Sequence, residues 1–434
     1  MNPNLLAIAG IVVLVVLFML RMPVAYAMGI VGLAGFALAT SPEAAFAILG
    51  KDFFATFSSG ALTVLPMFVF MGVIMSYTGI SNRLFNCAYK WLGQLPGGLA
   101  IATCYACAAF GACCGSTNAG AATMGKVTVP EMIKHDYDVS LATASVASAG
   151  SLAIMIPPST VLIIYGVLTE ESIGKLFIAG IIPGIMLATI FALIVYVLCR
   201  RNPRLGPAGE KTTLKEKLRS LLGITEVLIL FVFVMGGILI GFFTPTEAGA
   251  AGAAGALIIG LARRQLKWKD LLSGFAETAK ISAMIFLILT CATIFGHFMA
   301  VTRIPFVLSE WLGGLDLHPI IIMILIVFGY LIGGCFMDSF ALVVLTVPVL
   351  YPVIQRLGFD PIWFGVMIVL VAEMGVITPP VGVNVYVIKG VFPEIPLEKI
   401  FRGVWPFLIG MWICALIIMF FPQIVTFLPR YMSY

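Results

Sequence analysis

Long apolar runs alternate with short polar interruptions along almost the whole chain. A transmembrane helix needs about 20 predominantly apolar residues, because the hydrocarbon core of a bilayer is about 30 Å thick. The runs meet this length repeatedly, and the alternating segments of a transmembrane β-barrel are absent from the sequence. We therefore expect an all-α polytopic membrane protein. Uninterrupted spans are predicted at residues 5–20, 24–40, 60–76, 173–198, 225–241, 247–262, 280–299 and 404–421.

Two further apolar runs are cut in the middle by small and polar residues. The first, residues 96–133, is interrupted at residues 111–120, and each remaining piece is too short to cross a bilayer alone. The second, residues 318–355, is interrupted in the same way at residues 333–340. Backbone leaves the helix at membrane depth only where protein or a cavity satisfies its polar groups. We therefore predict two re-entrant helical hairpins with these polar segments at their tips.

Each hairpin is followed by a span that contains a diproline. Pro157-Pro158 interrupts residues 139–168, and Pro379-Pro380 interrupts residues 362–390. In both halves the diproline begins 46 positions after the first glycine of the preceding tip segment. Proline in a helix interior removes a hydrogen-bond donor and clashes with the preceding turn. Both segments are therefore predicted to be broken spans, and such breaks at corresponding places in two halves indicate a transporter's binding site.

The recurrence of these markers indicates a duplicated chain. Each half, residues 1–199 and 223–434, has five membrane crossings, one of them broken, plus a hairpin. Because five is odd, the second half enters the membrane from the opposite side, and the sequence predicts an inverted-topology repeat. Paired markers recur at offsets of 218 to 222 positions, namely Pro23 with Pro245, 91–93 with 311–313, 128–130 with 346–348, and the two diprolines.

Charge sets the expected orientation. Residues 200–222 form a basic linker, with seven basic and two acidic residues between positions 200 and 219. Short cytoplasmic loops are enriched in Lys and Arg. With this linker in the cytoplasm, only five of the 25 basic residues fall on the other side, and both termini are predicted to be periplasmic. Residues 41–58 are expected to form an interfacial arm, and residues 81–94 a polar turn.

Composition supports this class and narrows the chemistry. The chain has 434 residues, is 61% hydrophobic and 10% charged, and has a mean hydropathy of +1.11, far from soluble globular proteins. The nine cysteines lie in apolar runs, where small packing residues are a better interpretation than a zinc site at Cys104, Cys107 and Cys113, since no histidine is near. We expect no organic cofactor, no transition metal and no nucleic-acid partner.

The tips and breaks carry the residues suited to binding ions. A helix that begins at a tip exposes free N–H groups and the positive end of its dipole, which favour an anion. Hydroxyl, amide and carbonyl oxygens at the unwound turns suit a hard cation such as sodium. For any single residue, capping of a broken helix explains it equally well. The sodium candidates are Ser116, Thr117, Asn118, Ser159 and Thr160 around one ion, and Asp338, Ser339, Thr378 and Asn384 around another.

Two acidic residues lie inside the hairpin and broken span of the second half. Ionisable groups within spans are costly and usually functional. Asp338 is interpreted as an ion ligand, a proton carrier or a helix N-cap, and Glu373 is the second such group. The three histidines lie near predicted surfaces and receive no role.

Several motifs, in this order along nearly the whole chain, resemble the large membrane subunit of the tripartite ATP-independent periplasmic (TRAP) transporters. They are Ile156-Pro-Pro-Ser159 followed by Ile163-Ile-Tyr-Gly166, Phe243-Thr-Pro-Thr-Glu-Ala-Gly249, Phe336-Met-Asp338, Thr346-Val-Pro-Val-Leu350 and Ile377-Thr-Pro-Pro-Val-Gly382.

The resemblance implies a sodium-coupled importer of small organic acids in the bacterial inner membrane. It implies two partners, a small membrane subunit of about four helices and a periplasmic substrate-binding protein. It also implies an elevator mechanism, with residues 41–58 and 263–275 as arms of a scaffold. The tips and diproline loops would hold the substrate, at Gly115, Ser116, Pro157, Pro158, Gly334, Pro379, Pro380 and Gly382.

Other functions remain as alternatives. The nearest is a stand-alone sodium/dicarboxylate symporter that needs no binding protein. An intramembrane enzyme is disfavoured because Ser116 and Ser159 have no general base nearby in the sequence, and an ATP-driven pump because the chain has no GxxxxGK[ST] loop. Re-entrant hairpins also build channels, but broken crossing helices in an inverted repeat favour alternating access.

Overall fold

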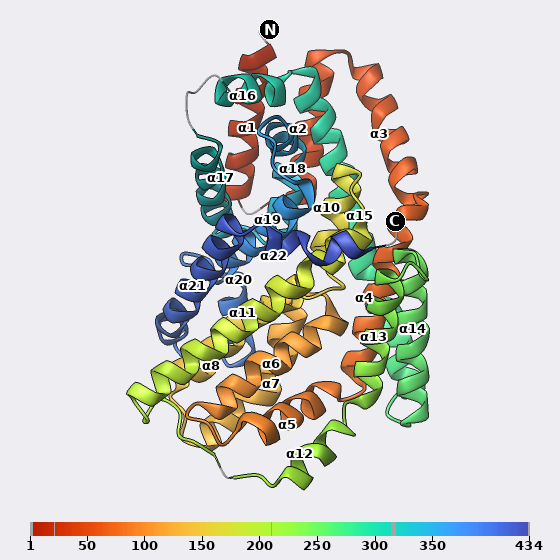
Figure 1. Cartoon of the computed structure of the whole chain (residues 1–434). Helices are drawn as coiled ribbons and strands as arrows, with labels where there is room; N and C mark the ends of the chain where they lie inside the picture. The colour runs from red at the N-terminus through yellow and green to blue at the C-terminus, as the bar shows by residue number, and fades with distance from the viewer. Residues whose placement is uncertain (1–2, 21, 210, 314–317, 433–434) are drawn as a thin grey trace.

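The computed structural model describes residues 3–20, 22–209, 211–313 and 318–432, and every regular element within these ranges is a helix. Seven of the helices are long and apolar enough to cross a membrane, or up to eight if the bent pair at residues 214–239 forms one span. Shorter apolar helices lie beside them (Figure 1). The expected all-helical polytopic architecture is confirmed.

In the first half, the helices are interrupted at the polar tip segment and at the diproline, and the names hairpin and broken span are kept for these helices. The hairpin is α6 and α7, joined at Gly115 and Ser116, and the broken span is α8 to α10, interrupted around the cis Pro157-Pro158 bond. The elements are α1 (Pro3–Met19), α2 (Val24–Ala39), α3 (Pro42–Phe57), η1 (Gly60–Thr63), α4 (Val64–Tyr77), α5 (Ile80–Leu92), α6 (Gly98–Cys114), α7 (Thr117–Lys134), α8 (Val139–Gly150), α9 (Leu152–Met155), α10 (Thr160–Thr169) and α11 (Ile173–Arg201).

The second half repeats this order. Its hairpin is α17 and α18, and its broken span is α19 and α20, interrupted around the cis Pro379-Pro380 bond. The elements are α12 (Leu214–Leu221), α13 (Thr225–Leu239), α14 (Pro245–Ala262), α15 (Trp268–Val301), α16 (Ile304–Gly313), α17 (Pro319–Gly334), α18 (Ser339–Arg356), α19 (Pro361–Ile377), α20 (Val383–Val391), α21 (Leu397–Phe420), α22 (Gln423–Thr426) and η2 (Leu428–Tyr431).

Two predicted segments differ in the structure. The polar turn expected at residues 81–94 is instead most of helix α5, which buries Ile80, Leu84 and Phe85 and exposes Asn82 and Asn86. The polar composition concealed a one-sided apolar pattern with helical spacing. The span expected at residues 280–299 is longer in the structure, because α15 runs without a break from Trp268 to Val301 and includes most of the expected arm at residues 263–275. No proline lies in that segment to interrupt it.

The helices pack in two groups. Helices α1 to α4 pack with α13 to α15, while the hairpins and broken spans pack with α11 and α21. Helix α19 is central to the second group, since all its residues from Ile362 to Ile377 are buried. In that group α10 packs against α18, and α20 packs against α7. The helix after each break therefore contacts the second helix of the other half's hairpin.

A buried acidic residue of helix α3, Asp52, lies beside His297 of helix α15. The Asp52 carboxylate is 6% exposed and lies 3.1 Å from the Nε2 atom of His297 on α15. The His297 side chain is 43% exposed and lies in the lining of a cavity of about 350 Å³. The two residues therefore differ. Removing His297 leaves a buried carboxyl group unpaired, whereas removing Asp52 leaves an imidazole that is not buried.

We expect His297→Ala to destabilise the protein more than Asp52→Ala. An unpaired buried polar group costs about 1–3 kcal/mol, whereas the imidazole of His297 is not buried and loses less when Asp52 is removed. Thermal unfolding of both variants checks the order. Glu43→Gln, a change on the same helix at an exposed position, is the control. Equal losses for the two variants would contradict the buried role of Asp52.

Candidate functional site

The two hairpin tips share one capping arrangement. Ser116 is the N-cap of α7 and accepts a hydrogen bond from Ala119 N at 3.5 Å. Asp338 is the N-cap of α18 and accepts one from Ala341 N at 2.9 Å. The first helical residues are then Thr117 and Ser339, and both are buried. The positive ends of two half-helices therefore begin at the two tips.

Both tips meet at a single buried carboxylate, that of Glu373 on α19. The hydroxyl of Thr117 donates to Glu373 Oε2 at 3.1 Å, and the hydroxyl of Ser339 donates to Glu373 Oε1. The Glu373 side chain is fully buried. Each of the two carboxylate oxygens thus bonds to a different hairpin. In the sequence, Glu373 is 256 positions from Thr117 and 34 positions from Ser339. A buried carboxylate needs such donors because desolvation of the charge is costly.

The first tip also rests directly on the first break. The hydroxyl of Thr160, at the start of α10, donates to the Gly115 carbonyl at 3.0 Å. Gly115 has a φ of +59°, and a Cβ atom at this position would lie 2.6 Å from the Pro158 carbonyl oxygen. Ser159 caps α10 by accepting from Leu162 N at 3.3 Å. Residues 115–117 and 158–160 therefore form one continuous unit.

The second break is anchored to the first half through Asn384. Its side-chain Nδ2 donates to the Ala147 carbonyl on α8 at 3.1 Å, while its Oδ1 atom is buried and accepts no hydrogen bond from the described residues. Thr378 donates to the Met374 carbonyl at 2.6 Å. A buried oxygen with free lone pairs is the kind of ligand that a hard cation binds.

The remaining predicted site residues divide by exposure. Pro157 and Pro158 are buried, whereas Pro379, Pro380 and Asn118 are exposed. Gly382 has a φ of +61° and lies against the Phe401 ring. Gly334 lies against the backbone of α19, where a Cβ atom would be 2.8 Å from the Ala372 carbonyl oxygen. Gly334 therefore permits close packing of the second hairpin on the central helix.

From the sequence, Glu373 counts among the costly ionisable groups but not among the predicted site residues. The signal was present, since a carboxylate inside a 17-residue apolar helix is unusual. The sequence gives no sign that Glu373 bonds to both hairpin tips. Among the described residues, no group of three His, Cys, Asp or Glu side chains is placed to hold a metal. The oxygen-rich residues around the tips and breaks suit a cation bound mainly by neutral oxygens.

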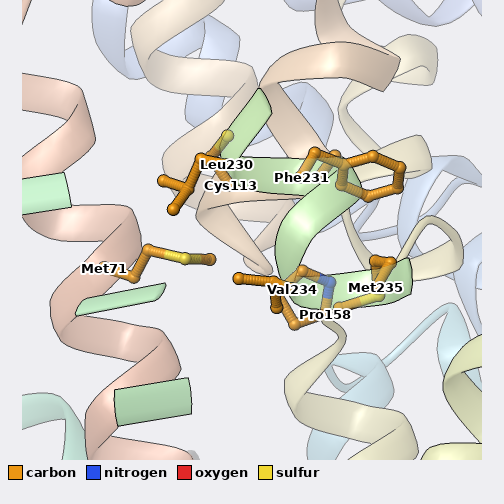
Figure 2. A pocket seen from close by; sticks show the side chains of 8 residues that line it. Met71, Cys113, Pro158, Leu230, Phe231, Val234 and Met235 are labelled. Carbon is orange, nitrogen blue, oxygen red and sulfur yellow. The ribbon is translucent and has the colours of Figure 1, made fainter. Parts of the chain in front are cut away.

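The first tip faces the other helix group across a small apolar cavity. Figure 2 shows its lining, with Met71 of α4 opposite Val234 of α13 and Pro158 of the first break. The cavity measures about 10 Å³, which is about the space of one water molecule. It is far too small for an organic acid. The contact between the two helix groups is therefore apolar and closed at this point.

Two larger cavities lie elsewhere and include none of the predicted site residues. One, of about 350 Å³, has Thr56, Thr293 and His297 in its lining. The other, of about 300 Å³, is lined almost entirely by apolar side chains of α1, α15, α16, α18 and the segment before α18. The candidate site is therefore defined by the meeting of tips, breaks and Glu373 rather than by an open pocket.

Comparisons with known proteins all indicate one family of transporters. The family model for the tripartite ATP-independent periplasmic transporter, DctM component, matches residues 11–424. The C4-dicarboxylate TRAP transporter large permease protein DctM of Pseudomonas aeruginosa is 33% identical over 386 residues, covering 89% of this chain and 90% of that protein. The isethionate TRAP transporter permease protein DctMQ of Oleidesulfovibrio alaskensis is 36% identical over 408 residues, and the match spans 93% of this chain and 63% of that relative.

A solved structure shares the fold. The YdaH transporter of Alcanivorax borkumensis superposes with a TM-score of 0.62 over 98% of both chains, at 13% sequence identity. At this identity the likeness concerns the fold alone.

Proposed function

The chain belongs to the DctM-component family of the tripartite ATP-independent periplasmic transporters, and on this basis we propose that it is the large membrane subunit of a sodium-coupled importer of a small organic anion. The observation that carries the proposal is the convergence of both hairpin tips on Glu373. Broken helices that meet at membrane depth are the arrangement in which transporters bind substrates and coupling ions.

The proposed substrate is a carboxylate or a sulfonate. The names of two relatives specify a C4-dicarboxylate and isethionate, which carry these two groups. Either group suits the N–H groups at the start of α7 and α18. The candidate contacts are the tip and break segments, with Gly115, Ser116 and Pro158 in the first half and Pro379, Pro380 and Gly382 in the second.

The proposed coupling ions are sodium. The first ion site is proposed at Ser116, Thr117, Asn118, Ser159 and Thr160, and the hydrogen bond of the Thr160 hydroxyl to the Gly115 carbonyl supports it. The second is proposed at Asp338, Ser339, Thr378 and Asn384, and the buried Oδ1 atom of Asn384, which accepts no hydrogen bond from the described residues, supports it. Neutral oxygens of this kind hold a hard cation without a transition-metal ligand set.

We further propose an elevator mechanism built on an inverted repeat. The matched helix order of the two halves and the reciprocal packing of α10 on α18 and α20 on α7 support the repeat. The hairpins, broken spans and α19 would move as one body against α1 to α4 and α13 to α15. The apolar contact of Met71 and Val234 with Cys113 and Pro158 (Figure 2) supports such movement, because apolar side chains slide past one another without breaking hydrogen bonds.

The name of the family makes this chain one component of a tripartite, ATP-independent system. We propose that the other two are a small four-helix membrane subunit and a periplasmic binding protein that delivers the anion. The proposed location is the bacterial inner membrane, with both termini periplasmic and the basic linker cytoplasmic.

Uptake into proteoliposomes tests the proposal. The chain is reconstituted with its small subunit, and uptake of labelled succinate and isethionate is measured with and without the binding protein, under an inward sodium gradient or none. Uptake that needs both sodium and the binding protein is expected. Sodium-driven uptake without the binding protein would instead establish the stand-alone symporter, and uptake indifferent to sodium would contradict coupling.

A further inference from the structure

The Glu373 carboxylate is placed to orient two hydroxyl groups at once. Its two oxygens accept from Thr117 and Ser339, which are the first residues of α7 and α18. A hydroxyl has one proton and two lone pairs. When its proton points to Glu373, its lone pairs are directed elsewhere, and a cation binds a hydroxyl through its lone pairs.

We infer that Glu373 is a positioning residue that prepares the hydroxyls of both hairpin tips to bind sodium and so couples the two tips. This inference rests on the proposed sodium coupling and adds a residue that connects the two halves. Glu373 itself is not assigned as an ion ligand. Its role is to accept both hydroxyl protons, so that the lone pairs of Thr117 and Ser339 remain available to a cation.

Two observations favour this role. The Glu373 side chain is fully buried, so water does not compete for the two hydroxyl protons. The two hydroxyls belong to the first residues of α7 and α18, so a change at Glu373 alters the geometry of both tips. Sodium affinity at each tip would therefore depend on one shared group.

Replacing Glu373 by glutamine separates this role from simple packing. Glutamine has nearly the same shape but offers one acceptor oxygen and an NH₂ donor. In either amide orientation, one of the two hydroxyls loses its acceptor. Partners that orient metal ligands typically contribute 10–100-fold to metal affinity. We expect Glu373→Gln to raise the sodium concentration for half-saturation about tenfold.

The experiment measures binding of radioactive sodium to the chain and its small subunit in lipid nanodiscs, without substrate or binding protein. Thr117→Val and Ser339→Ala are measured alone and combined with Glu373→Gln. Their matched controls are Thr103→Val and Ser145→Ala, two buried hydroxyls that bond to carbonyls of their own helices. The Thr117 and Ser339 variants should weaken sodium binding, and the controls should leave it unchanged.

The combined variants supply the decisive comparison. Because donor and acceptor act as one unit, each double variant should weaken sodium binding by less than the product of the two single effects. Unchanged sodium binding in Glu373→Gln, or fully multiplicative effects, would overturn the positioning role. If Glu373→Gln does not fold, Thr117→Val and Ser339→Ala still test it, since unchanged sodium binding in both would overturn it equally.

The inference and the proposed function fail in different ways. Sodium binding by the unmodified complex that is indifferent to Glu373→Gln would overturn only the role of Glu373. An unmodified complex that binds no sodium would overturn sodium coupling itself, and the positioning role with it.

Discussion

Replacing Gly334 by valine is expected to abolish uptake. Gly334 ends α17 immediately before the second tip, and a Cβ atom there would lie 2.8 Å from the Ala372 carbonyl oxygen and 2.9 Å from the Gly375 Cα atom. Both are backbone atoms of α19, so no side chain can rotate out of the way. Small residues allow such close helix contacts in membranes. Overpacking of this kind costs about 1–3 kcal/mol, occasionally more.

The functional loss should exceed the loss of stability. Gly334 is five positions before Ser339, which bonds to Glu373, so separating α17 from α19 also separates the tip from the carboxylate. Gly329 provides the control on the same helix, because a Cβ atom there meets no atom within 4 Å. Uptake and thermal unfolding are compared for Gly334→Val and Gly329→Val. Comparable uptake by the two variants would show that the close contact is not required.

The second large effect is expected for Gly115→Ala at the first tip. The residue has a φ of +59°, and the new Cβ atom would lie 2.6 Å from the Pro158 carbonyl oxygen. The left-handed conformation costs an L-residue roughly 1–2 kcal/mol, and the clash adds about 1–3 kcal/mol. A total of about 3 kcal/mol corresponds to roughly a 100-fold loss of the correctly formed tip. Sodium-driven uptake should fall accordingly.

Gly79→Ala isolates the clash from the conformational strain. Gly79 has a φ of +60°, nearly the same as Gly115, but a Cβ atom at this position would meet no atom within 4 Å. The Gly79→Ala variant should therefore lose only the free energy that a left-handed backbone costs an L-residue. Sodium half-saturation and uptake are measured for both variants. If Gly79→Ala and Gly115→Ala lose the same uptake activity, the close contact of Gly115 with Pro158 is not required for transport.

These expectations share one physical basis. The second tip is positioned by a close backbone approach at Gly334, the first by the approach of Gly115 to Pro158, and both by hydrogen bonds to Glu373. Interiors packed to this density transmit a displacement rather than absorbing it. A change at one contact is therefore expected to affect the geometry of the whole site.

Hydrophobicity and helix breakers in the sequence by themselves determined the all-helical membrane class and the positions at which the helices of both halves are interrupted. These features are local, because the length of an apolar run and the position of a proline or glycine act on neighbouring backbone. The predicted hairpin at residues 96–133 corresponds to α6 and α7, and that at residues 318–355 to α17 and α18. The same local logic failed at residues 81–94, where composition suggested a turn but spacing favoured helix α5.

Only the tertiary structure decided which polar groups meet. Thr117, Ser339 and Glu373 lie far apart in the sequence, and nothing in their spacing pairs them. Their meeting depends on how the two hairpins pack around α19, which is set by long-range contacts such as that of Gly334 with α19. Helix periodicity and hydropathy specify which residues are buried, but hydrogen-bond partners are chosen by the packing of whole helices. For this reason the sequence identified the breaks, and the structure identified the carboxylate between them.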